Sequence, residues 1–104
     1  MTKRTSAPTE TERHEMIVAL LAGADVPASD RVLLTALKSV GIRVDLDTIR
    51  QDLSTLETRG LIAIELLGVR GGEFEFYVAT ITPDGRKEAD KIMEEAKALE
   101  EAGQ

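Results

Sequence analysis

The polar residues between positions 47 and 58 form the segment whose spacing is best suited to molecular recognition. Placed at 100° intervals on a helix, they line one side of it: Asp47, Thr48, Gln51, Ser54, Thr55 and Thr58. Because hydroxyl and amide side chains are short, such a face can approach another polar surface closely and exchange hydrogen bonds with it. Glutamine and threonine can address the edges of nucleic-acid bases in this way. The pattern indicates recognition through hydrogen bonds.

The residue types needed for most covalent and metal chemistry are missing or isolated. The chain has no cysteine and a single histidine, His14, so it offers no thiolate site and neither a catalytic triad nor a multi-histidine metal site stands out. All-carboxylate sites remain open, but we expect the carboxylates on helix caps and solvent faces, outside any pocket. We therefore expect no enzyme, no cofactor and no metal site, and we interpret His14 as a surface or flanking histidine.

Length and composition predict one small, acidic globular domain. The 104 residues are 42% hydrophobic and carry a net charge of −6, so a packed core is feasible. No apolar run approaches the roughly 20 residues that cross a bilayer, and the N-terminus lacks the apolar stretch of a signal peptide. With no cysteine, these features predict a cytoplasmic protein without a membrane partner. Because aromatic residues are few, we expect no RNA partner.

Apolar spacing and capping residues predict four helices and one hairpin. The helices are expected at about residues 9–22, 30–40, 46–59 and 83–102, and the strands at residues 61–67 and 74–82. Gly23 and Gly41 are expected to end the first two helices, whereas Asp45 and Thr82 cap the last two. Residues 26–28 are interpreted as a linker, and residues 1–8 as a flexible arm.

The expected core lies on one face of each of the first three helices. It comprises Met16, Ile17, Leu20 and Leu21, then Val32 or Leu33, Ala36, Leu37 and Val40, and then Leu46, Ile49, Leu53 and Leu56.

Three helices, a hairpin and a last helix are the element order of a winged helix-turn-helix. The stretch from Thr48 to Ile62 resembles the recognition helix and first strand of bacterial winged-helix regulators. The run Thr-Pro-Asp-Gly-Arg at residues 82–86 resembles the step by which many of them enter their last helix. The proportions resemble PadR-like and ArsR-like regulators, and also small winged-helix proteins of Mu-like phages. Two departures stand out: metal-sensing ArsR relatives use thiolates, which this chain lacks, and most DNA-binding members carry more positive charge.

The expected fold class is therefore α+β, mainly α with a small β-hairpin and a long C-terminal helix. Residues 1–8 form the arm, residues 9–82 the winged helix-turn-helix domain, and residues 83–104 a C-terminal helix that serves dimerisation.

The resemblance implies a transcriptional regulator, bacterial or from a phage, that binds duplex DNA through its third helix and wing. Thr48, Gln51 and Thr55 would face the major groove, and Arg50 and Arg59 would lie at its flanks, within reach of phosphates. Carried over in the same way, the DNA-binding set comprises Arg43, Thr48, Arg50, Gln51, Thr55, Arg59 and the wing-tip residue Arg70.

The charge of this region opposes that function. Residues 42–72 hold four arginines against five carboxylates, and Asp47 and Asp52 are expected near the DNA backbone. The alternative is an acidic winged-helix module for protein–protein interaction or assembly, without DNA binding. Measurable, salt-dependent affinity for random duplex DNA would separate the two functions.

The last helix carries an apolar stripe at the spacing of a coiled-coil seam. It comprises Ala89, Ile92, Met93, Ala96 and Leu99. These residues either pack on the domain's own first helix or meet a second copy, and we predict a homodimer.

Overall fold

The computed structural model describes residues 9–68 and 75–102. The predicted arm, residues 1–8, the predicted wing-tip arginine, Arg70, and most of the predicted turn between the two strands lie outside the described residues.

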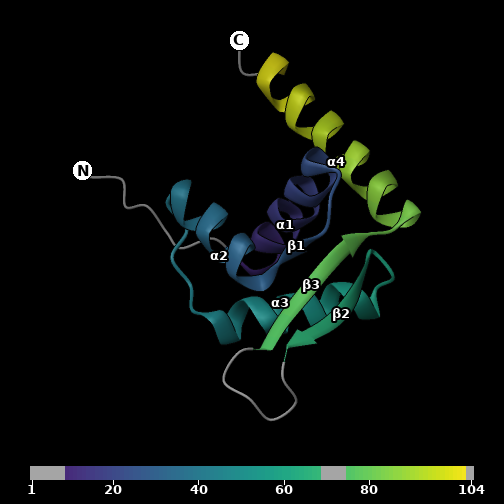
Figure 1. The fold of residues 1–104 in the computed structure, drawn as a ribbon. Coiled ribbons are helices and arrows are strands. Elements are labelled where there is room, and N and C mark those ends of the chain that lie inside the picture. Colours follow the sequence, from purple (N-terminus) through teal and green to yellow (C-terminus); the bar gives the residue numbers. More distant parts are fainter. Residues whose placement is uncertain (1–8, 69–74, 103–104) are drawn as a thin grey trace, which may run out of the picture.

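Within the described residues the chain folds into four helices and one antiparallel sheet, which confirms a mainly α winged-helix fold (Figure 1). The elements are α1 Glu10–Ala24, β1 Ala28–Ser29, α2 Asp30–Ser39, α3 Leu46–Thr58, β2 Ile62–Gly68, β3 Glu75–Ile81 and α4 Pro83–Ala102. In Figure 1, α3 lies beside the two long strands, and the C-terminal half of α4 extends beyond the rest of the domain.

Each helix begins at a residue that the sequence marks as a cap. Thr9 accepts a hydrogen bond from the Glu12 N–H at 3.1 Å, and the Glu12 carboxylate accepts one from the Thr9 N–H, completing a capping box. Asp45 accepts a hydrogen bond from the Thr48 N–H at 2.9 Å. Because these side chains satisfy N–H groups that have no partner within the helix, they fix where α1 and α3 start.

The end of α1 differs from the prediction. Gly23 does not end the helix, which continues to Ala24 and is capped by Asp25 in the left-handed conformation, with φ 57°. The Asp25 N–H donates to the Leu21 carbonyl, and its carboxylate pairs with Arg86 of α4. Aspartate tolerates this conformation better than most residues. At the end of α2 the prediction is confirmed, because Gly41 has φ 90°.

The sheet has a third strand whose first residue, Ala28, the sequence analysis assigned to a linker. Ala28 and Ser29 form β1 and pair with Ala79 and Val78 of β3, giving the strand order β1-β3-β2. Two residues are too few to show an alternating pattern, so this strand exists only through its pairing with β3. It attaches the segment between α1 and α2 to the wing, which is the hairpin formed by β2 and β3, near the C-terminal end of β3.

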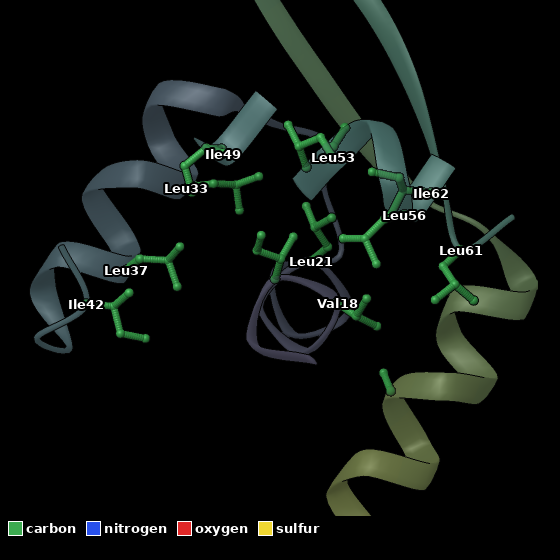
Figure 2. Close-up of a cluster of buried hydrophobic side chains, with 13 residues drawn as sticks. Val18, Leu21, Leu33, Leu37, Ile42, Ile49, Leu53, Leu56, Leu61 and Ile62 are labelled. Carbon is green, nitrogen blue, oxygen red and sulfur yellow. The ribbon is translucent and has the colours of Figure 1, made fainter. Parts of the chain in front are cut away.

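The core surrounds α1. Figure 2 shows Val18 and Leu21 of α1 between side chains of the other helices and of the segment that leads into β2. The buried apolar residues are Ile17, Val18, Leu21, Leu33, Leu37, Ile42, Ile49, Leu53, Leu56, Leu61, Ile62, Ala79 and Ala89. The predicted face of α3 is confirmed in its buried residues Ile49, Leu53 and Leu56. Val40 was expected in the core but is 57% exposed, because it is the C-cap of α2 and has left the helical spacing.

α4 starts close against the base of the wing. The Thr82 N–H donates to the Leu61 carbonyl at 3.1 Å, and its hydroxyl donates to the Gly60 carbonyl at 2.7 Å. Gly85, in the first turn of α4, is buried, and a Cβ atom there would lie 2.1 Å from the Leu61 carbonyl oxygen. This close approach explains why the run at residues 82–86 contains a glycine.

None of the helices in the described segments combines the length and apolar character that a bilayer span requires.

Candidate nucleic-acid interface

Four polar residues of α3 form its outer face: Asp47, Gln51, Ser54 and Thr55. All four are exposed. They line an open hollow of about 600 Å³, which is completed by Glu10, Arg50 and Tyr77. The predicted outward direction of Gln51 and Thr55 is confirmed. Thr48, the third predicted groove residue, is half-buried and does not line the hollow.

Asp52 does not lie on this surface, which corrects the sequence analysis. Its side chain is 1% exposed and packs toward α1. Arg13 of α1 donates to both carboxylate oxygens, from Nε to Oδ2 at 2.8 Å and from Nη2 to Oδ1 at 3.0 Å. This hydrogen bond to Asp52 raises the pKa of Arg13 above its usual value. The negative charge of Asp52 is thus neutralised inside the domain by a paired, fork-shaped contact.

His14 is also buried, which corrects its assignment as a surface or flanking residue. Its Nε2 lies 3.1 Å from Asp52 Oδ1 and 3.9 Å from a carboxylate oxygen of Glu10, one turn earlier on α1. Three groups of metal-ligand type therefore meet within 4.8 Å. The Arg13 guanidinium already bonds both Asp52 oxygens, so the protein itself supplies the cation that such a cluster would otherwise attract.

Arg50 forms a second ion pair with a buried carboxylate. The sequence analysis placed it at the flank of the groove as a phosphate contact. Its Nε donates to Oδ2 of Asp30, which is 0% exposed, at 2.7 Å, and its Nη2 donates to the Glu75 carbonyl at 2.7 Å. The guanidinium also lies 4.6 Å from the centre of the Tyr77 ring. The hydrogen bond to Asp30 raises the pKa of Arg50. Arg50 therefore braces α3 against α2 and β3.

Sequence reasoning missed both ion pairs for the same reason. Arg13 and Asp52 are 39 residues apart and belong to different helices, and nothing in a single sequence links them. The one available signal was the helical angle of Asp52, which falls at the edge of the apolar stripe formed by Ile49, Leu53 and Leu56.

Neither of the other two predicted cations that the structure describes, Arg43 and Arg59, lines the open hollow. Arg43 is exposed in the segment between α2 and α3. Arg59, the C-cap of α3, lines a separate cavity of about 50 Å³ with side chains of α1 and α4. The DNA contacts of both residues remain predictions.

The stripe on α4 divides into two parts. Ala89 is buried and Ile92 partly buried against the chain's own core, so these two predicted dimerisation residues are engaged within the domain. Met93 is 62% exposed and Leu99 74% exposed, and Ala96 lies exposed between them. The exposed part belongs to the segment of α4 that extends beyond the domain in Figure 1.

Solved structures of winged-helix regulators are similar to this fold. A PadR family transcriptional regulator from Eggerthella lenta matches with a TM-score of 0.67 and 23% identity over 86% of this chain and 80% of that one. A PadR-like transcription factor from Bacteroides fragilis matches with a TM-score of 0.67 and 19% identity over 88% of this chain and 90% of that one.

A third structure contains nucleic acid. Bacillus subtilis PadR in complex with operator DNA matches with a TM-score of 0.62 and 19% identity, over 77% of this chain and 45% of that one. No protein-family model matches the sequence, and no curated protein matches it. At these identities the likeness establishes the fold and confirms the resemblance to PadR-like proteins at that level.

Proposed function

We propose that this protein is a transcriptional regulator that binds duplex DNA, with the outer face of α3 in the major groove and the wing alongside. The observation that carries the proposal is the internal neutralisation of Asp52 and Asp30. Because Arg13 and Arg50 pair with these two buried carboxylates, neither adds a free negative charge to the surface that would meet the phosphates.

The chemistry of the exposed side chains supports the same function. Gln51 and Thr55 lie one helical turn apart in the open hollow, where they can reach base edges. A glutamine is suited to the paired donor and acceptor of adenine. One of the similar structures, Bacillus subtilis PadR, was solved in complex with operator DNA, which supports a DNA partner for this chain.

Selection of bound duplexes from a random pool tests the proposal. We expect the unchanged protein to enrich a sequence, and Gln51→Ala to relax the preference at one position at a cost of about 1–3 kcal/mol. Thr11→Ala, an exposed helical residue of α1, is the control and should leave the enriched sequence unchanged.

A protein-interaction module is the competing function, and the net charge of −6 favours it. Such a module would show no salt-dependent affinity for random duplexes at low ionic strength. That result, together with no enriched sequence, would overturn the proposal.

We further propose that the protein acts as a homodimer through Met93, Ala96 and Leu99. Exposed apolar side chains of this size on a helix that extends beyond its own core are suited to a second copy. A two-fold dimer would present two α3 helices about 34 Å apart, one turn of DNA.

Sedimentation tests this part. Leu99→Glu should convert the dimer to monomer, whereas Ala98→Glu, which adds the same charge on another side of α4, should not. An unchanged mass for Leu99→Glu, or a monomeric unchanged protein, would overturn the dimer.

A further inference from the structure

Asp47 is the carboxylate of α3 that remains on the outer face. Asp52 is paired inside the domain, and Glu57 accepts a hydrogen bond from the Ile64 N–H at 2.9 Å. Asp47 is exposed, lines the open hollow beside Gln51, and takes part in none of the ion pairs found among the described residues. A free carboxylate there would repel phosphate groups. We therefore ask which favourable contact with DNA Asp47 could make.

The chemistry of a carboxylate in the major groove is specific. It can only accept hydrogen bonds when ionised, and the N4 amino group of cytosine is the donor that it pairs with there. Asp47 precedes Gln51 by four residues, so the two side chains lie on the same side of α3, one turn apart. It also lies in the first turn of α3, and N-terminal residues of a recognition helix are those that contact base edges in helix-turn-helix proteins.

We infer that Asp47 is a specificity-determining residue that reads a cytosine, close to an adenine read by Gln51. This inference rests on the proposed function. It predicts that each half-site of the DNA contains a C·G pair beside an A·T pair. It also predicts weaker non-specific affinity for DNA, because the same carboxylate repels every phosphate group near it.

An acid in the first turn of a helix also interacts favourably with the helix dipole. Asp84 has that position in α4, where it is exposed and lies outside the hollow. Asp84→Asn therefore removes the same charge from the same helical position without touching the outer face of α3, and it is the matched control for Asp47→Asn.

The test is selection from a random duplex pool with the unchanged protein, Asp47→Asn and Asp84→Asn, followed by anisotropy titrations of the enriched duplex. We expect the unchanged protein to prefer cytosine over thymine at one position by at least about fivefold. Asp47→Asn should lose that preference and bind random duplexes more tightly, whereas Asp84→Asn should change neither. The adenine preference should depend on Gln51 alone.

The outcomes separate the two proposals. If Asp47→Asn keeps the cytosine preference, or if the unchanged protein enriches a site without cytosine, the inference is overturned while DNA binding stands. If the unchanged protein shows no salt-dependent affinity for any duplex, the proposed function itself is wrong, and the inference falls with it.

Discussion

At the scale of single residues, the junction between the wing and α4 depends on a glycine, Gly85. Gly85 approaches the backbone of Leu61 so closely that a Cβ atom would lie 2.1 Å from its carbonyl oxygen and 2.7 Å from Ile81 Cγ1. The carbonyl belongs to the backbone and also accepts the Thr82 N–H, so it cannot move aside without breaking that hydrogen bond.

Gly85→Ala should therefore lower the free energy of unfolding by about 1–3 kcal/mol, the usual cost of overpacking. Chemical denaturation measures this change. Gly23→Ala is the matched control, because a Cβ there meets nothing within 4 Å and replacing a helical glycine by alanine stabilises by about 0.5–1 kcal/mol. Equal effects of the two substitutions would contradict the close approach.

Asp45 gives the start of α3 a dependence on pH. The Thr48 side chain, and then the Thr48 N–H, lower the pKa of the Asp45 carboxyl below its ordinary value. Because the folded-state pKa is the lower one, the charged carboxylate stabilises the fold above the ordinary pKa. This contribution is lost as the pH falls through the lowered value.

Asp45→Asn keeps a capping acceptor but loses the titration. The stability difference between the unchanged protein and Asp45→Asn should therefore be largest near neutral pH and shrink at about pH 3. Denaturation midpoints at both pH values check this. Asp45→Ala removes the cap itself and should be less stable at both, and a pH-independent gap for Asp45→Asn would contradict the lowered pKa.

At the scale of elements, two ion pairs with buried carboxylates hold α3 against its neighbours. Arg13 and Asp52 join it to α1, and Arg50 and Asp30 join it to α2. Arg50 also donates a hydrogen bond to the Glu75 carbonyl of β3, so its guanidinium connects α3 to the wing as well as to α2. The orientation of the proposed DNA-reading face therefore depends on residues that do not belong to it.

Arg50→Lys should not replace this contact, because a single ammonium group lacks the fork that reaches Asp30 and Glu75 together. We expect a loss of up to about 3 kcal/mol in unfolding free energy, with faster amide hydrogen exchange in β3. Arg43→Lys, an exposed residue, should have no effect. If Arg50→Lys leaves both stability and exchange unchanged, Arg50 has no bracing role, and the predicted phosphate contact becomes its better assignment.

The elements themselves were largely predictable from the sequence, whereas their contacts were not. Caps such as Asp45 and the apolar stripe of α3 depend on residues three or four positions apart, which a single sequence shows directly. β1 and the partner of Asp52 depend on residues about 40 to 50 positions away, and only the folded chain brings these together. The same limit explains the reassignment of Arg50, since its partner Asp30 lies 20 residues earlier.

At the scale of the whole molecule, the net charge of −6 must coexist with the proposed DNA binding. Much of the acidic charge lies on α4, which also extends beyond the domain in Figure 1. Within the described residues, the proposed DNA-binding set has two exposed arginines, Arg43 and Arg59, so each proposed phosphate contact should be visible in the salt dependence.

Arg43→Ala should reduce the magnitude of the slope of log Kobs against log[salt] by about 0.9 for each phosphate contact that it removes. Titrations at several salt concentrations measure the slope. Lys91→Ala on α4 removes the same charge and should leave it unchanged. A slope that is equal for both variants would remove Arg43 from the interface.

The ion pair between Arg13 and Asp52 should make substitutions at these two distant positions depend on each other. Replacing Arg13 alone would leave the Asp52 carboxylate buried without its cation, which should lower the free energy of unfolding by about 3–5 kcal/mol. Replacing Asp52 alone would remove the carboxylate that the Arg13 guanidinium binds. Homologous proteins should therefore keep both residues or replace both together, most readily by a pair of apolar residues of similar volume. The two positions form a compact signature by which relatives that orient this helix in the same manner can be recognised.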